Sequence, residues 1–590
     1  DARRGGYWRI APPAGYRTTR RYIDGTNILL TRFETDTGTA EVVDFMPTLG
    51  FGAGLGIADR VHDGMIVRIV RGVRGTVTMR QELFPAFNYG RDDNTFEIVP
   101  RRGVLICGPG EYLSVLCESA MEIDGGGLTG EFDIEAGDEK HFVATHHDRP
   151  APIWLDFVPG MVDRLFNNEL LGWRSWIGRC SYEGPYADAV RRSALTLKML
   201  DYLPTGAVAA AATTSLPEHL GGVRNWDYRY AWIRDSTYVL YSLITIGYRE
   251  EAESFFQWVI DASDIDPSNL KIMYRVDGRL DLHEVELDHL SGYKNSEPVR
   301  IGNKAFQQRQ LDVYGEVLDA AHTYRRFGGF ISSALWDYLA EVVAEVLKHW
   351  REPDAGIWEV RSEPRRMTYS NVLCWVALDR AVRLAEIDRR DAPVQAWREV
   401  RDTIRQEVME MGVDSERGVF TEAFGGTALD ASALSFPHRH FIAADHPVMR
   451  ATIEAIEREL SVDGLVARYK VDGDDDDNLD GLPGSEGHFV ITSCWLIDCM
   501  IGLGQTERAR GHIERMLERA NDLGLFAEQI DPRTGCHLGN FPQAFSHLSI
   551  INSIVNYARA TGALQDVEEE SDDTGELSAG QLEIPYEGVD

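Results

Sequence analysis

Two β-prone runs near the start of the sequence flank a turn-forming tetrapeptide: Ile28-Leu29-Leu30-Thr31-Arg32-Phe33-Glu34-Thr35, then Asp36-Thr37-Gly38-Thr39, then Ala40-Glu41-Val42-Val43-Asp44-Phe45-Met46. β-Branched and aromatic residues fill both runs, and Asp and Gly occupy the link between them. This pattern is typical of an antiparallel hairpin. The stretch therefore predicts that the chain begins with β-structure.

Short runs of the same kind occur throughout the first 160 residues. They cluster or alternate apolar residues between Gly, Asp and Pro, at 65–70, 77–83, 104–106, 112–116 and 141–145. Such regular spacing favours an antiparallel β-sandwich over residues 1–160. We expect this domain to be structural rather than catalytic.

From about residue 161 onward, apolar residues recur with the periodicity of an α-helix. A connecting helix is expected at 162–177 within a linker of residues 161–186, and further helices at 187–200, 235–247, 249–263, 309–326, 331–349, 368–386, 393–412, 428–437, 447–461, 488–503, 505–522 and 543–561. The links between these helices alternate between short and long. This alternation is expected where helix hairpins surround a centre and the long loops build a site at one end. We predict a helical domain at 187–562 and a disordered acidic tail at 563–590.

Composition narrows the class of protein. A chain of 590 residues favours two domains, and its formal net charge of −34, with nearly all basic residues being Arg, resembles a salt-adapted, halophilic proteome. An acidic surface can also serve only hydration, and it makes nucleic acid an unfavourable partner. The 7 cysteines are an odd number, and no apolar run reaches membrane-spanning length. We expect a reduced, cytoplasmic protein, although a start at Asp1 leaves an upstream export signal open.

Two separate tetrapeptides hold candidate catalytic acids. They are Gly356-Ile357-Trp358-Glu359 and Phe526-Ala527-Glu528-Gln529, both expected at helix ends. Cleavage of an acetal needs one protonated carboxyl for the leaving oxygen and one carboxylate that activates water or attacks the anomeric carbon. Glu359 and Glu528 could fill these roles, but residue pattern alone does not select them from so many acids.

The densest polar and aromatic cluster is Asn225-Trp226-Asp227-Tyr228-Arg229-Tyr230-Ala231-Trp232-Ile233-Arg234-Asp235-Ser236. Sugar sites combine flat aromatic faces with carboxylate and guanidinium groups that bind hydroxyls. An ordinary helix N-terminus, capped by Asp235 and with Arg234 paired at the surface, would explain the pattern equally well.

This cluster, together with three further stretches, resembles glycoside hydrolase family 15. The stretches are Tyr293-Lys294-Asn295-Ser296-Glu297-Pro298-Val299-Arg300-Ile301-Gly302-Asn303, Gly356-Ile357-Trp358-Glu359-Val360-Arg361 and Leu538-Gly539-Asn540-Phe541-Pro542-Gln543-Ala544-Phe545-Ser546-His547. The family includes glucoamylase, glucodextranase and microbial trehalases, and its trehalase-type bacterial and archaeal branch is the most similar. The resemblance extends from about Tyr7 to Ala560. It implies an N-terminal β-sandwich joined to an (α/α)6 barrel, and inversion at the anomeric centre.

The resemblance also implies roles for individual residues. Glu359 matches the general acid and Glu528 the general base, and the pair is expected roughly 6.5–9.5 Å apart, as inverting enzymes require. We expect apolar walls, including Trp358, to raise the pKa of Glu359, and Glu528 to stay ionised. The remaining substrate-binding candidates are Arg234, Asp235, Tyr228 and Trp232 for the first glucose, Trp358 beside the acid, Arg300 for the leaving sugar or as a loop anchor, and Glu486 as a sugar contact or helix cap.

No metal or other cofactor is expected. His283 and His289 are six apart, whereas four places two zinc ligands on one helical face, and His438 with His440 has no third ligand nearby. The acidic run from Asp472 to Asp480 lacks the calcium-loop pattern and predicts a solvated insertion. This insertion, and the absence of the family's Asp-Gly-Ser-Ile-Asp-Trp type of strand ahead of residue 1, are the two departures from the family pattern.

We therefore predict an inverting, exo-acting α-glucosidase that hydrolyses trehalose, a small-molecule sugar. Release of β-glucose from α-glucans or malto-oligosaccharides is the alternative, because the first glucose would bind alike in both. An α-glucoside phosphorylase is disfavoured because phosphate would replace the base, Glu528. A silent sugar-binding protein is disfavoured because both glutamates are present. The sequence does not indicate an oligomeric state.

Overall fold

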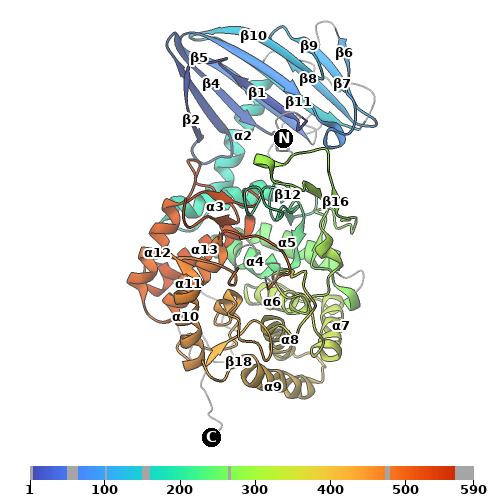
Figure 1. Ribbon diagram of the computed structural model, residues 1–590, viewed down its shortest axis with the longest axis vertical. Coiled ribbons are helices and arrows are strands. Elements are labelled where there is room, and N and C mark those ends of the chain that lie inside the picture. The colour runs from blue at the N-terminus through green and yellow to red at the C-terminus, as the bar shows by residue number, and fades with distance from the viewer. Residues whose placement is uncertain are drawn as a thin grey trace. The chain divides into compact units, whose positions relative to one another are not determined.

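The computed structural model describes residues 4–48, 64–99, 103–148, 160–263, 267–471 and 479–564. The chain divides into two compact units, Asp1–Arg179 and Cys180–Asp590 (Figure 1). The predicted acidic tail from residue 565 onward and the acidic run at 472–478 lie outside the described residues.

The first unit consists of antiparallel strands followed by one helix. The elements are β1 (Tyr7–Ala11), β2 (Tyr16–Tyr22), β3 (Leu29–Thr35), β4 (Gly38–Phe45), β5 (Met65–Phe84), the short 3-10 helix η2 (Phe87–Gly90), β6 (Thr95–Val99), β7 (Gly103–Cys107), β8 (Tyr112–Cys117), β9 (Glu122–Asp124), β10 (Gly127–Glu135), β11 (Glu139–His147) and α2 (Met161–Ile177). The predicted β-rich start of the chain is confirmed.

Strand β5 organises this unit. Its first half pairs with β4 and β11, and its second half pairs with β1 and β10. The sequence predicted two separate strands here, because Gly72 and Gly75 interrupt the apolar pattern. The structure instead carries one strand through them, since partner strands supply ladder hydrogen bonds on both sides. Buried residues from both sets of strands, including Val42, Met79 and Ile134, share one hydrophobic core.

The second unit is mainly helical, which confirms the predicted helical domain. Its helices are α3 (Ala187–Leu200), α4 (Ser236–Thr245), α5 (Arg249–Ser263), α6 (Asp312–Arg326), α7 (Ser333–His349), α8 (Thr368–Ile387), α9 (Val394–Met411), α10 (Pro447–Glu459), α11 (Val490–Gly502), α12 (Thr506–Glu518) and α13 (Ala544–Ala560). None of the described helices is both long and apolar enough to cross a membrane.

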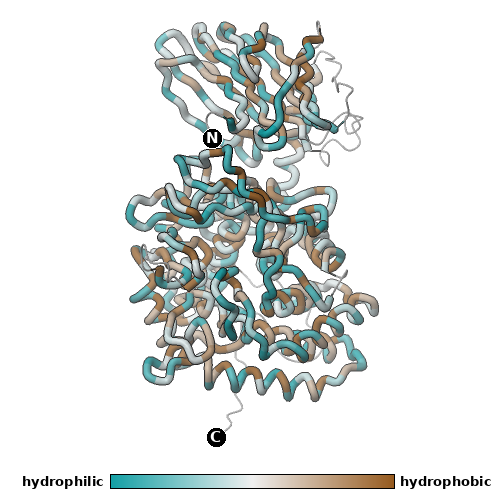
Figure 2. Tube along the Cα trace, turned by 45° about the vertical axis from the view of Figure 1, so that its right-hand side comes forward, coloured by the Kyte–Doolittle hydropathy of each residue, from teal (hydrophilic) through white to brown (hydrophobic). Residues whose placement is uncertain are grey.

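Burial separates these helices into two kinds. Nearly every residue of α8, α11 and α13 is buried, whereas α9 buries only Trp397, Ile404 and Val408. Hydrophobic and hydrophilic residues accordingly alternate along several helices (Figure 2). Helix α8 packs against α6 and α9, while α13 packs against α11, α3 and α4. Fully buried helices thus lie inside amphipathic ones.

A helix expected at 428–437 is instead the short 3-10 helix η7 (Ala431–Ser435). Asp430 caps it by accepting a hydrogen bond from the Ser432 N–H, at 2.7 Å. Pro437 lies two residues after its end and lacks the N–H that a longer helix would need. The spacing of apolar residues in this segment therefore reflects their burial and not an α-helix.

Short strands and turns fill the long loops of this unit. The strands pair as β12 (Asp201–Tyr202) with β13 (Ala207–Val208), β14 (Ala231–Trp232) with β15 (Met273–Tyr274), β16 (Val285–Glu286) with β17 (Arg300–Ile301), β18 (Val413–Asp414) with β19 (Val419–Phe420), and as a sheet of β20 (Ser461–Val462), β21 (Leu465–Val466), β22 (His488–Phe489), β23 (Gln529–Ile530) and β24 (His537–Leu538). The remaining 3-10 helices are η3 (Ile233–Asp235), η4 (Pro267–Asn269), η5 (Tyr293–Asn295) and η6 (Lys304–Gln307).

Candidate active site

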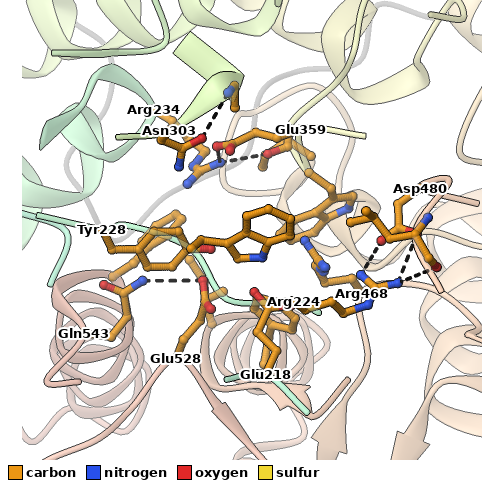
Figure 3. A pocket seen from close by; sticks show the side chains of 18 of the residues that line it. Glu218, Arg224, Tyr228, Arg234, Asn303, Glu359, Arg468, Asp480, Glu528 and Gln543 are labelled. Atoms are coloured by element: carbon orange, nitrogen blue, oxygen red, sulfur yellow. Dashed lines mark hydrogen bonds and ion pairs between the residues drawn. The ribbon is translucent and has the colours of Figure 1, made fainter. Parts of the chain in front are cut away.

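A pocket in the second unit gathers side chains from segments that are far apart in the sequence (Figure 3). Five of the predicted site residues line it: Tyr228, Arg234, Trp358, Glu359 and Glu528. Figure 3 shows Glu359 on the upper side of the pocket and Glu528 on the lower side. The structure thus brings both candidate acids to one cavity.

Glu359 is held rigidly at the pocket wall. Its backbone has a left-handed φ of +58°, and its N–H donates to the Gly356 carbonyl at 3.1 Å. The Trp232 indole N–H donates to Glu359 Oε1 at 2.7 Å, and Arg234 Nη1 lies 3.4 Å from the same oxygen. One carboxyl oxygen is therefore bonded to protein donors, which leaves Oε2 to face a ligand.

Trp358, the residue before Glu359, is fixed by its own contacts. Its indole N–H donates to Asp430 Oδ1 at 2.8 Å, and its ring packs against Phe489 and Trp495. The Arg468 guanidinium lies over the ring, 5.4 Å from its centroid. Trp358 thereby contributes an aromatic wall beside the carboxyl of Glu359.

Glu528 lies just before strand β23 and not at a helix end, because helix α12 already ends at Glu518. Its carboxylate accepts long hydrogen bonds, each 3.5 Å, from Gln529 and Gln543. Burial raises the pKa of Glu528 to about 7, against the smaller opposing effect of Arg468. The expectation of a fully ionised Glu528 was therefore wrong, and this carboxyl exchanges its proton near neutrality.

Trp232 and Asp235 stand behind the pocket wall. Trp232 ends β14, is buried and meets the Tyr228 ring edge-on at 5.4 Å. Asp235 ends η3, and its Oδ1 lies 3.4 Å from Arg234 Nε. Burial raises the pKa of Asp235 to about 6. Asp235 thus helps to orient Arg234, whose Nη1 also donates to the Ile357 carbonyl at 2.7 Å.

Glu486 is not among the lining residues, because two arginines engage it. Arg468 Nε donates to Glu486 Oε1 at 3.1 Å, and Arg224 Nη1 lies 3.4 Å from Oε2. Arg224 also donates to Asp480, which accepts a further bond from the Tyr469 hydroxyl at 2.7 Å. Arg224, Arg468 and Asp480 do line the pocket. Sequence reasoning missed all three: Arg224 pairs with Asp480, which is 256 positions away, and the expectation that Asp480 belongs to a solvated insertion was wrong, because this side chain is buried against Arg224.

Arg300 supports the pocket from outside. Its guanidinium stacks on Trp226 at 4.7 Å from the ring centroid, and Arg361 lies 4.6 Å from the centroid of the same ring. Arg300 also donates to the Val223 carbonyl at 2.8 Å and pairs with Glu286 at 3.1 Å. Trp226 and Arg361 line the pocket, but Arg300 does not. These contacts match the loop-anchor alternative.

One further carboxyl, missed from the sequence, lines the pocket: Glu218. It is only 2% exposed, and burial, followed by the charge of Glu528, raises its pKa to about 8. The Pro217-Glu218 pair carried no signal because it precedes the aromatic cluster by several residues.

A possible metal site occurs elsewhere, in the first unit. Among the described residues, the side chains of Glu139, His141 and Asp163 come close enough to share an ion. Arg71 donates to Glu139 at 2.6 Å, so a guanidinium already occupies part of this group. None of these residues lies in the pocket.

The chain matches a family model described as glycosyl hydrolases family 15, over residues 184–555. It is 41% identical to a protein named trehalase from Mycolicibacterium smegmatis, across 97% of this chain and 86% of that protein. It is 36% identical to a trehalase from Thermoplasma volcanium, across 93% of this chain and 86% of that protein. Among solved structures, a bacterial glucoamylase complexed with acarbose matches with a TM-score of 0.74 and 13% identity, covering 94% of this chain and 88% of its own.

Proposed function

The chain belongs to glycosyl hydrolases family 15 and is a glycoside hydrolase, and from this membership we propose that it hydrolyses trehalose to two molecules of glucose. The observation that supports this substrate is similarity, at 36–41% identity over 93–97% of the chain, to bacterial and archaeal proteins named trehalase. The glucoamylase match, at 13% identity, bears on the fold alone.

We further propose that the second unit is an (α/α)6 barrel, preceded by a β-sandwich. Buried helices that pack in succession, α4 on α6 and α6 on α8, then α11 on α13 and α13 on α4, support this arrangement. The glucoamylase match extends over 94% of the chain and supports both parts. The pocket would then lie where the long loops gather.

In the proposed mechanism Glu359 is the general acid. The indole N–H of Trp232 and the guanidinium of Arg234 both reach Oε1, so the proton belongs on Oε2, which is free to reach the glycosidic oxygen. As that proton moves, the bond between the anomeric carbon and the leaving oxygen breaks. The two donors then stabilise the carboxylate that forms.

Glu528 is the proposed general base. Located across the pocket, it takes a proton from a water molecule as the water oxygen attacks the opposite face of the anomeric carbon. The attacked glucose leaves with β configuration, and the other glucose keeps its α configuration. A pKa raised to about 7 lets Glu528 accept this proton at neutral and mildly alkaline pH.

Proton NMR of the anomers released first tests the proposal. The protein, held in concentrated KCl to suit its acidic composition, receives trehalose and maltotriose in separate samples. Equal initial amounts of α- and β-glucose from trehalose are expected. Release of β-glucose from maltotriose alone would replace trehalose by α-glucans as substrate, and α-glucose alone from either sugar would refute inversion.

A further inference from the structure

Glu218 has a feature that separates it from the other acids of the pocket. Its Oε2 is buried and, among the residues that the structure describes, has no hydrogen-bond partner. Every other lining carboxylate has a partner: Glu359 bonds Trp232, Glu528 bonds two glutamines, and Asp480 bonds Arg224. A buried carboxyl oxygen without a hydrogen-bond partner destabilises the protein unless a ligand supplies that bond.

The cations nearest to Glu218 are committed to other acids. Arg224 pairs with Asp480, and Arg468 pairs with Glu486. The Glu218 backbone is fixed, since its N–H donates to the Arg224 carbonyl at 3.0 Å. Glu218 lines the pocket from this fixed position, so its carboxyl can bond a ligand that enters the pocket.

Glu218 lies beside the proposed base. A Cβ at Gly539 would stand 3.1 Å from Glu528 Oε2 and 3.9 Å from Glu218 Cγ, so both side chains meet over this glycine. Figure 3 likewise shows the two side chains next to each other, with Glu218 toward Arg468. The raised pKa of Glu218 keeps its charge from opposing ionisation of Glu528 near neutrality.

The pocket has two ends. Tyr228, Trp232 and Arg234 cluster at one end, in contact with each other or with Glu359. Glu218 stands at the other end, with Arg224 and Leu482. Exposed residues lie close to Glu218 and Leu482 along the chain: Leu220, two residues after Glu218, is 44% exposed, and Pro483, directly after Leu482, is also exposed. Both segments therefore run from the pocket lining to exposed positions, and this is the side on which we place the leaving sugar.

Building on the proposed function, we propose that Glu218 is a specificity-determining residue whose unpartnered carboxyl oxygen binds a hydroxyl of the leaving glucose. A buried carboxyl suits this task because it can accept a hydrogen bond from a sugar hydroxyl or donate its own proton to one. Sites built to bond a hydroxyl discriminate strongly against substrates that lack it. The contact would favour trehalose over α-glucosides whose leaving group carries no hydroxyl at that point.

Paired substrates test this assignment. Trehalose needs the leaving-sugar site, whereas α-glucosyl fluoride presents the same first glucose with fluoride as its leaving group. In Glu218→Met, which keeps the length of the side chain but cannot form the bond, kcat/KM for trehalose should fall roughly 10- to 100-fold. The value for the fluoride should stay within about threefold. Glu218→Gln should recover much of the loss because its amide can still bond a hydroxyl.

Glu169→Met is the matched control, because Glu169 is also a buried glutamate with a pKa raised to about 7 but belongs to the first unit. It should leave both substrates unaffected, and thermal unfolding checks that each variant folds. Equal losses on both substrates in Glu218→Met would show that Glu218 acts through Glu528, and no loss on trehalose would show no contact. Either result overturns the assignment, whereas wild-type protein inactive on trehalose would overturn the proposed function as well.

Discussion

Replacing Trp232 by Phe isolates the hydrogen bond that holds the proposed acid. The indole N–H lies 2.7 Å from Glu359 Oε1, and this bond strengthens when Glu359 gives up its proton in the transition state. A hydrogen bond to a charged group contributes about 1.5–3 kcal/mol, and each 1.36 kcal/mol is tenfold in rate. We therefore expect kcat for trehalose to fall roughly 10- to 150-fold.

The same variant should behave differently with α-glucosyl fluoride. Fluoride departs without a proton from Glu359, so no new carboxylate forms for the indole to stabilise. Steady-state kinetics on the two substrates should show a large loss with trehalose and a loss within about threefold with the fluoride.

Trp258→Phe is the matched control for loss of ring volume. Trp258 is buried in α5, and among the described residues its indole nitrogen has no hydrogen-bond partner. Both substrates should be turned over normally by this variant. Parallel losses on the two substrates in Trp232→Phe, or unchanged turnover of trehalose, would refute the assignment of Glu359 as an acid supported by Trp232.

Four further predictions concern the base and the buried charges. Glu528→Gln should lower kcat roughly 10²- to 10⁴-fold on both trehalose and the fluoride, because water must be activated in each case; a loss on trehalose alone would contradict a base role. Activity should rise with pH through about 7 as Glu528 ionises, and an acid limb more than two units lower would argue against it. Burial raises the pKa of Glu218 and Glu528, so the folded state holds their protons more tightly than the unfolded chain does. Their contribution to the free energy of unfolding therefore falls as pH rises from about 4.5 toward 8. Denaturant unfolding should show that this free energy falls less with pH in Glu218→Gln than in the wild type. Arg439→Met should cost about 3–5 kcal/mol in the free energy of unfolding, since it leaves the buried carboxylates of Glu316 and Asp319 without a shared cation; a cost below about 1 kcal/mol would contradict this.

Local pattern was enough to predict most of the fold. Period-two runs predicted the strands around residues 28–46, and helical periodicity predicted twelve of the thirteen expected helices correctly, because burial on one face leaves a pattern in neighbouring residues. The break expected within β5 failed for the opposite reason. Gly72 and Gly75 disfavour a strand locally, but pairing with β4 and β10 outweighs that preference.

The candidate site was only partly predictable. The resemblance selected Glu359, Glu528 and Arg234; Glu359 and Arg234 lie in long stretches that match the family, and Glu528 lies in a matching tetrapeptide. Arg224 and Asp480 are 256 positions apart, and no local pattern indicates that they pair. Glu218 was likewise invisible, since its character comes from burial and from the Glu528 charge. Such properties arise only once distant segments fold together.

The left-handed backbone of Glu359 has a consequence for how this protein could evolve in the laboratory. At φ +58° a side chain with a Cβ lowers the stability of the folded state by about 1–2 kcal/mol, and glycine avoids this penalty. Stability and turnover therefore favour different residues at this one position. Variants selected only for heat resistance would drift toward glycine at 359, and resistance gained in that way would accompany loss of the catalyst.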